Sequence, residues 1–288
     1  MSVVVETQPV CLIRLSGGLG NQLFQYAAGR SVALRTGAKL VLDVSFYDKG
    51  RHRTFELNSF PIQAEVRNAL NGNFTILRRM NLFRSVFSRE RVYREPHFHF
   101  DPNFEALRAP VTLEGYFQTF RYFAEIEHQI RQELKVPVPV DRETLRLDRQ
   151  MADCDSTVLH IRRGDYVSSS KVSRIYSECS MDYYRNAMES ISGSAPVLVL
   201  SDDLQWAKTN LPEVKPLLFP DVAAVRSGLA DLWLMTRARN HIIANSSFSW
   251  WGAWLANPGV GKKIAPKKWF NDSSVNDGDL IPTDWIRL

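Results

Sequence analysis

The sequence predicts an α/β protein whose strands form parallel sheets. Short apolar segments alternate with helical segments, most clearly between residues 157 and 255. This alternation is typical of parallel strands joined by right-handed crossover helices. A proline-rich stretch separates this region from an N-terminal part of similar size. A chain of 288 residues is long enough to bury two modest cores or one large one.

The proline-rich stretch is Val136-Pro137-Val138-Pro139-Val140, which we expect to be extended. We place the domain boundary there, with an N-terminal domain at 1–136 and a C-terminal domain at 141–288. The predicted strands are 10–15, 39–42, 157–161, 196–201 and 241–244. The predicted helices are 181–191, 248–255 and two that begin at Leu204 and Asp231.

Bulk properties are those of an ordinary globular protein with a net charge of +5. No apolar run approaches the ~20 residues that span a bilayer, and no signal peptide opens the chain. The three cysteines, Cys11, Cys154 and Cys179, are few and odd in number, which is typical of a reducing compartment. We therefore expect a cytoplasmic protein.

Basic residues are concentrated in two places. Basic segments with interleaved apolar residues favour an anionic membrane surface, so peripheral contact with the inner membrane face is one interpretation. A solvated helix face explains the same residues. No stacking or groove-reading motif accompanies them, and nucleic acid is not an expected partner. The residues are Arg78, Arg79, Arg84, Arg89, Arg91 and Arg94, and then Lys262, Lys263, Lys267 and Lys268.

The most informative segment is His160-Ile161-Arg162-Arg163-Gly164-Asp165-Tyr166, which follows an apolar strand. Open α/β sheets bind ligands at the carboxyl ends of their strands. Arg162 and Arg163 offer planar forks of donors that match phosphate oxygens. Gly164 lets the main chain approach a ligand, and Asp165 can hold an arginine or accept from a loop amide. The segment predicts a diphosphate site, and the plainer interpretation is a surface salt bridge.

A glycine-rich turn follows the predicted strand at 10–15 and leads into a helix. Gly18 and Gly20 permit a tight turn, and free amides at the helix start attract anions. Asn21 and Gln22 add side-chain donors. The turn is neither a GxGxxG fingerprint nor a P-loop, and many such turns only join a strand to a helix.

Asn245-Ser246-Ser247 precedes a tryptophan-rich helix. Small hydroxyl side chains at this position are ordinary N-caps, and they are also well placed to donate to a phosphate. We expect at least two of Trp250, Trp251 and Trp254 to belong to the core.

Four segments together resemble glycosyltransferase family 11, the α-1,2-fucosyltransferases: GGLGNQLFQYAAGR, HIRRGDY, LSDD and ANSSFSWWGAWL, in this order and spacing. The resemblance covers nearly the whole chain. It implies the GT-B architecture, with two Rossmann-like domains facing a cleft. It also implies GDP-β-L-fucose as donor and a galactoside-terminated glycan as acceptor. Transfer would go to the 2-hydroxyl of a terminal β-galactoside with inversion, and without a cofactor or a required metal.

The resemblance also implies roles for the motif residues. Arg162, and then Arg163, would stabilise the charge that develops on the departing GDP, with Asp165 beside them. Asp203 would grip the guanine edge and Asp202 would support the loop, although both acids also suit an N-cap for the helix from Leu204. The remaining donor-side residues are His160 beside the base or ribose, Gly18, Gly20, Asn21 and Gln22 in the turn, and Asn245, Ser246 and Ser247 at the phosphates.

The sequence does not single out one catalytic base. Glu114 and Gln118 follow a predicted strand and are acceptor-side candidates, with Asp43 as a rival. Two Asp-x-Asp strings, 153–155 and 277–279, are interpreted as chance. The alternatives are the same fold with another GDP-sugar or linkage, and a non-catalytic protein that binds a GDP-sugar or a glycan.

Overall fold

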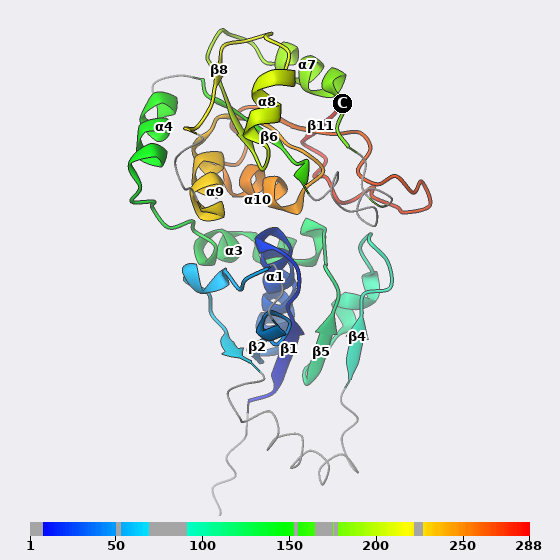
Figure 1. Ribbon diagram of the computed structural model, residues 1–288. Helices are drawn as coiled ribbons and strands as arrows, with labels where there is room; N and C mark the ends of the chain where they lie inside the picture. The colour runs from blue at the N-terminus through cyan, green and yellow to red at the C-terminus, as the bar shows by residue number, and fades with distance from the viewer. Residues whose placement is uncertain are drawn as a thin grey trace, which may run out of the picture. The chain divides into compact units, whose positions relative to one another are not determined.

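The computed structural model describes residues 8–49, 53–68, 91–152, 155–164, 175, 178–221 and 227–288 (Figure 1). The chain divides into two compact units between Leu134 and Lys135, just before the proline-rich stretch. Each unit contains one sheet, and every strand pair in both sheets is parallel. The predicted α/β fold with parallel sheets is therefore confirmed.

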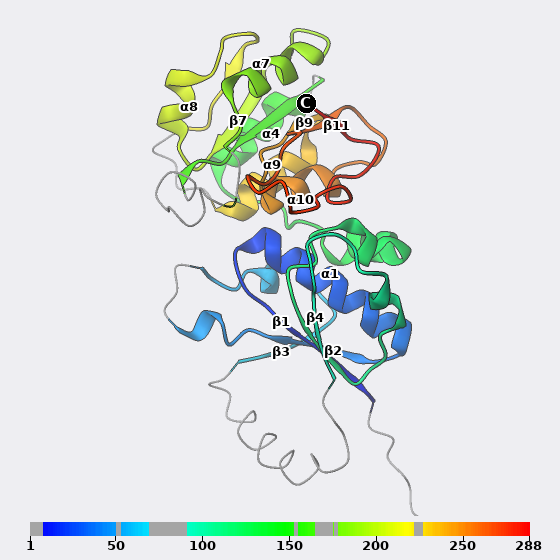
Figure 2. The same ribbon diagram turned by 90° about the vertical axis from the view of Figure 1, so that its right-hand side faces the viewer.

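The N-terminal unit has a five-stranded sheet in the order β3-β2-β1-β5-β4. Its first helix packs on β1 and β2 (Figures 1 and 2) and ends at Gly37, whose left-handed φ of 64° is typical of a glycine C-cap. The strands are β1 (Val10–Arg14), β2 (Lys39–Asp43), β3 (Glu65–Arg67), β4 (Val92–Arg94) and β5 (Val111–Glu114). The helices are α1 (Leu19–Thr36), η1 (Tyr47–Lys49), η2 (Leu57–Ser59), η4 (Pro102–Ala106), η5 (Phe120–Tyr122), η6 (Ala124–Ile126) and α3 (Glu127–Glu133).

The C-terminal unit has a six-stranded sheet in the order β11-β10-β9-β6-β7-β8. The strands are β6 (Thr157–Ile161), β7 (Val197–Ser201), β8 (Leu217–Leu218), β9 (Asn240–Ile242), β10 (Lys263–Ala265) and β11 (Ile286–Arg287). The helices are α4 (Arg142–Ala152), α7 (Met181–Ser190), α8 (Leu204–Asn210), α9 (Gly228–Arg237) and α10 (Ser247–Leu255).

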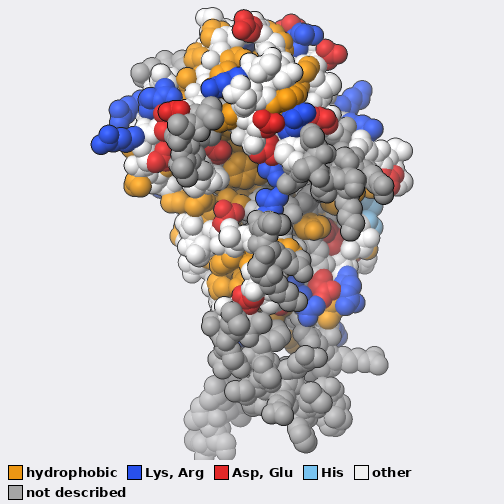
Figure 3. Space-filling model, in the orientation of Figure 1, with side chains coloured by type: hydrophobic (Ala, Val, Ile, Leu, Met, Phe, Trp, Pro, Cys, Tyr) orange, Lys and Arg blue, Asp and Glu red, His pale blue; other side chains and the backbone are white. Residues whose placement is uncertain are grey.

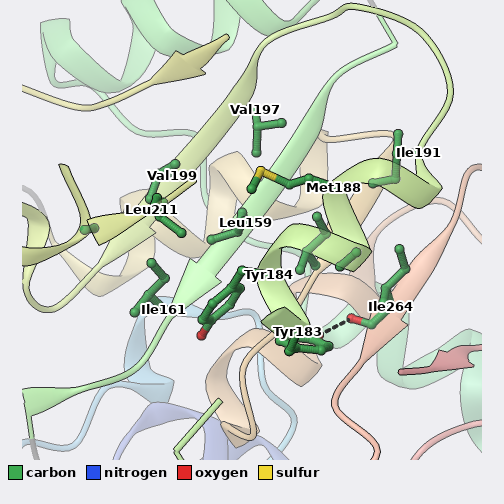
Figure 4. Close-up of a cluster of buried hydrophobic side chains, with 13 residues drawn as sticks. Leu159, Ile161, Tyr183, Tyr184, Met188, Ile191, Val197, Val199, Leu211 and Ile264 are labelled. Atoms are coloured by element: carbon green, nitrogen blue, oxygen red, sulfur yellow. Dashed lines mark hydrogen bonds between the residues drawn. The ribbon is translucent and has the colours of Figure 1, made fainter. Parts of the chain in front are cut away.

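Helices cover both faces of this second sheet. Successive residues of its central strands point to opposite faces, so each face contributes to a separate core cluster. Leu159 of β6 and Val199 of β7 join a core cluster with Met188 of α7 (Figure 4). Val158 of β6 joins a second cluster with Leu198 and Leu200 of β7 and with residues of α4 and α9. The unit is thus a three-layer sandwich of helices, sheet and helices.

The tryptophan-rich helix α10 is part of the core. Trp250 and Trp251 are fully buried and Trp254 is almost so, which confirms the expectation from sequence. The Trp250 indole N–H donates to the Leu280 carbonyl at 2.9 Å. These rings therefore anchor α10, which begins directly after the Asn245-Ser246 turn.

The first basic segment lies only partly within the described residues. Arg78, Arg79, Arg84 and Arg89 lie outside the described residues. In the second group, Lys263 is buried in β10 with its ammonium 5.8 Å from the centre of the Trp285 ring. Figure 3 shows acidic and basic side chains interspersed on the described part of the face in view. In the described ranges, no helix combines the length and apolar character that crossing a membrane requires.

Candidate functional site

Three of the predicted motifs follow neighbouring strands of the C-terminal sheet. β6 pairs with β7 on one side and with β9 on the other. The carboxyl ends of β9, β6 and β7 lead into residues 243–247, 162–164 and 202–203. The later strands continue outward from β6 in both directions, so β6 and β9 flank a topological switch point. Open α/β sheets bind ligands at such a point.

Asp202 organises the loop after β6. Its Oδ1 accepts a hydrogen bond from the Arg163 amide at 2.9 Å, and its Oδ2 accepts one from the Gly164 amide at 3.0 Å. The Arg162 guanidinium lies 3.0 Å from the same Oδ2. A Cβ on Gly164 would stand 3.1 Å from this oxygen, so a side chain there would crowd the contact. The carboxylate thus fixes both the main chain and Arg162.

Arg163 extends from this loop to the start of α8. Its guanidinium lies 3.3 Å from Asp203 Oδ2 and 4.5 Å from the centre of the Trp206 ring. A weaker ion pair reaches Glu178 at 3.5 Å. Asp203 Oδ1 accepts the Trp206 amide at 3.1 Å, so Asp203 is the N-cap of α8. Both acids of the 202–203 pair therefore order cationic or main-chain groups at this edge.

His160 lies at the end of β6, 6% exposed, with its ring 5.7 Å from that of Phe248. Burial, and secondarily the charge of Arg162, lowers the pKa of His160 to about 3. The imidazole is therefore neutral at physiological pH. Its buried Nδ1 has no hydrogen-bond partner within the described part of the protein. Buried polar atoms are rarely left unpaired. An unpaired one requires an explanation, such as a bound ligand.

The turn before α10 combines a buried amide with a more accessible hydroxyl. Asn245 is 1% exposed, and its side-chain N–H donates to the Trp269 carbonyl at 3.0 Å, which ties the turn to the core. Ser246 is the N-cap residue of α10 by backbone geometry, but its hydroxyl makes no capping hydrogen bond. Ser247 is the first residue of the helix. The start of α10 faces the same sheet edge as Arg162 and carries the positive end of the helix dipole.

The glycine-rich turn lies in the N-terminal unit, between β1 and α1. Gly17 has a φ of +82°, and a Cβ there would stand 2.4 Å from the Asn21 side-chain nitrogen. Gly18 is the N-cap residue of α1, and Gly20 is buried inside the helix. Gln22 is fully buried; it donates to the Thr54 carbonyl at 2.8 Å and accepts from the Glu56 amide at 2.9 Å. In this position Gln22 holds the neighbouring loop.

A row of alternating charges crosses the carboxyl edge of the N-terminal sheet. In strand order the row is Arg67, Asp43, Arg14, Glu114 and Arg94. Glu114 forms ion pairs with the guanidinium groups of Arg14 and Arg94, the second at 2.7 Å. Asp43 lies 3.8 Å from Arg14 and accepts the Ser45 amide at 3.0 Å. The two acids proposed as catalytic bases are therefore both ion-paired within one row.

Gln118 joins the two loops of this edge. Its side-chain N–H donates to Asn21 Oδ1 at 2.9 Å, and the residue is 4% exposed. Gln25 of α1 makes a second link, donating to the Gly115 carbonyl at 2.9 Å and to the Ser16 hydroxyl at 3.3 Å. The turn after β5 and the glycine-rich turn after β1 thus form one connected unit.

Other predicted elements contribute less. Asp165, Asp153 and Cys154 lie outside the described residues. Asp277 pairs with Arg287 at 3.1 Å and accepts from the Trp269 amide at 3.3 Å, which gives that Asp-x-Asp string a structural role. Within the described ranges, no group of three or more His, Cys, Asp or Glu side chains is arranged to hold a metal ion.

Three contributors to the two edges were not singled out from the sequence. Gly17 supplies the left-handed backbone of the glycine-rich turn, and the Gly17-Gly18 pair was a visible signal for it. Trp206 follows Asp203 by three residues, within the first turn of a predicted helix, so its side chain could have been placed near that of Asp203. Glu178 carried no signal, because its approach to Arg163 depends on the tertiary fold.

The chain is similar in sequence to several known glycosyltransferases. The alpha-1,2-colitosyltransferase of Escherichia coli is 33% identical over 299 residues, spanning 100% of this chain and 99% of that protein. The O-antigen biosynthesis glycosyltransferase WbnK of Escherichia coli is 29% identical, spanning 95% and 99%. A galactoside 2-alpha-L-fucosyltransferase of Caenorhabditis elegans is 27% identical, spanning 67% and 57%.

The family model for glycosyl transferase family 11 matches residues 10–288, which is nearly the whole chain and includes both sheets. The chain therefore belongs to glycosyltransferase family 11.

Proposed function

We propose that the protein is an inverting α-1,2-fucosyltransferase of GT-B architecture that uses GDP-β-L-fucose. The C-terminal unit binds the donor, and the N-terminal unit mainly binds the acceptor. The acceptor is a glycan with a terminal β-galactoside, which receives the sugar on its 2-hydroxyl. The reaction needs no divalent metal ion.

The observation that carries this proposal is the anchored loop after β6. Asp202 holds its amides, and the loop presents Arg162 and Arg163 at a switch point, beside the start of α10. The buried, unpaired Nδ1 of His160 lies at the end of the same strand. Fixed cations, a helix N-terminus and an unpaired buried nitrogen together suit an anionic nucleotide ligand.

The chemistry follows from where charge develops. Breaking the bond between the anomeric carbon and GDP leaves negative charge on the diphosphate, while the sugar becomes oxocarbenium-like. Arg162 and the Ser246 and Ser247 end of α10 would stabilise that charge with donors already in place. Asp203 would accept the paired N–H donors of the guanine edge, and its Oδ1 already accepts one main-chain amide. His160, neutral and buried, would bond the base or the ribose.

A closely related donor is the second candidate. The bacterial relative of 33% identity is named for colitosyl transfer. Colitose is L-fucose without the 3-hydroxyl, so the two donors differ by one polar group. A site that bonds that hydroxyl would reject the deoxy sugar strongly, by ~10⁴-fold or more, whereas an apolar site would discriminate weakly.

The test is a turnover assay with GDP-fucose and GDP-colitose, each with and without lactose as the β-galactoside, in EDTA. We expect GDP release that depends on lactose, and a product whose linkage analysis shows an α-1,2 bond. Faster turnover of GDP-colitose would assign the other donor. Tight GDP binding with no release from either donor, across a panel of galactosides, would favour a non-catalytic binding protein. Activity that strictly requires a divalent ion would contradict the metal-free mechanism.

A further inference from the structure

We propose that Glu95 is a positioning residue of the acceptor site, and that the turn it holds, residues 115–118, receives the acceptor sugar with Tyr116 as its platform. This inference rests on the proposed function and adds Glu95 and Tyr116 to the acceptor-side candidates Glu114 and Gln118.

Glu95 directly follows β4 and caps the turn after the neighbouring strand β5. Its carboxylate accepts the Tyr116 amide at 2.7 Å and the Phe117 amide at 3.0 Å. Its own amide donates to the Glu114 carbonyl at 2.9 Å. A Cβ on Gly115 would stand 2.4 Å from Glu95 Cβ, so only glycine at 115 lets the carboxylate approach. One side chain thus supplies two acceptors to a turn in another part of the sequence.

The turn holds a backbone conformation that its sequence does not favour. Phe117 has a φ of 54°, the one non-glycine residue with positive φ among the described residues. A bulky residue in this region is strained, and such strain persists where the surroundings impose it and is concentrated at functional sites. Phe117 is fully buried against the rings of Tyr93, Phe104 and Tyr122. Packing and the Glu95 hydrogen bonds together impose the conformation.

The result is an exposed aromatic ring among buried ones. Tyr116 is 40% exposed, whereas the adjacent Phe117 is buried. Tyr116 lies at the carboxyl end of β5, which pairs with β1 at the switch point of this sheet, where ligands bind. Tyr47 donates its hydroxyl to the Gly17 carbonyl at 3.1 Å, in the turn that follows β1. An exposed ring with a polar tip suits the apolar face and hydroxyls of a sugar.

The electrostatics of Glu95 support a switchable clamp. Burial raises the pKa of Glu95 to about 7, against the opposing effects of the two amides and His97. Further titratable or charged groups on the adjoining segments are Arg91, Tyr93 and Arg94 at β4, His99 and Asp101 after it, and Glu114 and Tyr116 on the β5 side. A carboxylate accepts both amides better than a neutral carboxyl does. The clamp is therefore strongest above neutral pH and weakens below it.

The experiment compares Glu95→Ala, Glu95→Gln, Tyr116→Ala and Tyr116→Phe with the wild type. The readouts are kcat, KM for lactose, GDP affinity by calorimetry, and saturation-transfer NMR on lactose in the presence of GDP. Glu127→Ala, which removes only one partner of an ion pair on α3, is the control. We expect Glu95→Ala and Tyr116→Ala to raise KM for lactose about tenfold or more, with GDP affinity unchanged. Tyr116→Phe should retain the platform.

Glu95→Gln separates positioning from proton transfer. Its carbonyl can accept both amides, so it should restore most of the affinity for lactose that alanine loses. It cannot ionise, so the rise in KM for lactose between about pH 8 and about pH 6 should disappear. A large loss of kcat in Glu95→Gln would overturn the positioning role in favour of a general base. Equal losses of GDP and lactose binding in Glu95→Ala would indicate a general folding defect and also overturn it.

The NMR readout keeps this inference distinct from the proposed function. If the wild type transfers no sugar from either donor, the proposed transfer reaction fails. Saturation transfer to lactose that Tyr116→Ala abolishes would still support the acceptor turn. Unchanged transfer to lactose in both alanine variants would refute it, whatever the enzyme does with the donor.

Discussion

Asp202 fixes the peptide of Arg163 from the neighbouring strand, accepting its amide at 2.9 Å, and accepts the next amide at 3.0 Å through its other oxygen. The same carboxylate pairs with Arg162. The position of the proposed diphosphate-binding arginine thus depends on a residue about 40 positions later in the chain.

Asp202→Ala should therefore impair both the fold and the reaction. Two amides and a guanidinium lose their acceptor, which costs about 1–3 kcal/mol of unfolding free energy. The loosened loop should lower kcat/KM by about 100-fold, because displacement of about 1 Å in a reacting group has that effect. Urea unfolding and GDP release measure the two effects separately. The control is Asp182→Ala, whose exposed pair with Arg185 should contribute less than ~1 kcal/mol. Equal behaviour of the two variants would remove Asp202 from this role.

Gly164→Ala tests the same contact from the other side. The added Cβ would meet Asp202 Oδ2 at 3.1 Å, closer than carbon and oxygen normally approach. The Asp202 carboxylate or the loop after β6 must therefore shift. We expect weaker GDP binding in calorimetry with a small change in stability. Gly228→Ala is the matched control, because its Cβ would meet only Phe248, at 3.9 Å. GDP affinity at the wild-type level in Gly164→Ala would show that the loop tolerates the shift.

The strands at the proposed donor site could be predicted from sequence because their signals are local. The segment 157–161 is a short apolar run, and β6 has the same limits. The starts of α7 and α8 match the predicted Met181 and Leu204, but one helix start was predicted less well. The helix predicted from Asp231 begins at Gly228, where the Ser227 hydroxyl accepts the Ala230 amide. Asp231 lies in the first turn, where an acid also favours the helix dipole, so it resembled a start.

The edge of the N-terminal sheet could not be predicted, because it depends on strand order. Arg14 meets Glu114 only because β5 lies beside β1, and nothing in either strand encodes that neighbour. Glu95 is a stronger example. It lies outside every recognised motif, and its role appears only when the end of β4 and the turn after β5 are brought together. Contacts between segments distant in sequence carry no periodicity from which to infer them.

Arg162→Ala should abolish transfer while the protein stays folded. Removing one donor to the transition state costs roughly 3 kcal/mol, or more than 100-fold in kcat. Arg162→Lys should recover little activity, since a point charge lacks the planar fork of the guanidinium. Arg185→Ala, in the exposed pair with Asp182, is the control and should retain activity. Near-normal turnover in Arg162→Ala would contradict the assignment.

His160→Phe should flatten the dependence of stability on pH. The unfolded chain takes up a proton near the ordinary pKa of 6.5, whereas the folded protein does so only near 3. The stabilisation from neutral His160 is therefore complete above pH 6.5 and is lost as the pH falls toward 3. Phenylalanine does not titrate, so the difference in unfolding free energy between variant and wild type should shift in favour of the variant on acidification.

Urea unfolding at several pH values measures this difference. His241, whose burial lowers its pKa to about 4, is present in both proteins and cancels from the comparison. His128→Ala, which changes an exposed histidine on α3, is the control for loss of a histidine outside the site. GDP affinity should fall in His160→Phe, because the unpaired Nδ1 is lost. A pH slope identical to that of the wild type would mean that His160 takes up its proton at the same pH in the folded protein as in the unfolded chain.

Asp203 has two roles that one substitution can separate. Asp203→Ala removes the N-cap of α8, which costs about 0.5–2 kcal/mol, as well as the proposed guanine acceptor. Asp203→Ser keeps a good capping residue but has no carboxylate for the paired donors of guanine. We expect Asp203→Ser to be nearly as stable as the wild type, to bind GDP more weakly and to lose preference for GDP over ADP.

The wild type should reject ADP by ~10⁴-fold, because adenine presents an unpaired acceptor to the carboxylate. Calorimetry with GDP, ADP and UDP gives the ranking for each protein. If Asp203→Ser binds GDP as the wild type does, the carboxylate serves only to cap α8 and to pair with Arg163, and the guanine edge must be recognised by another group.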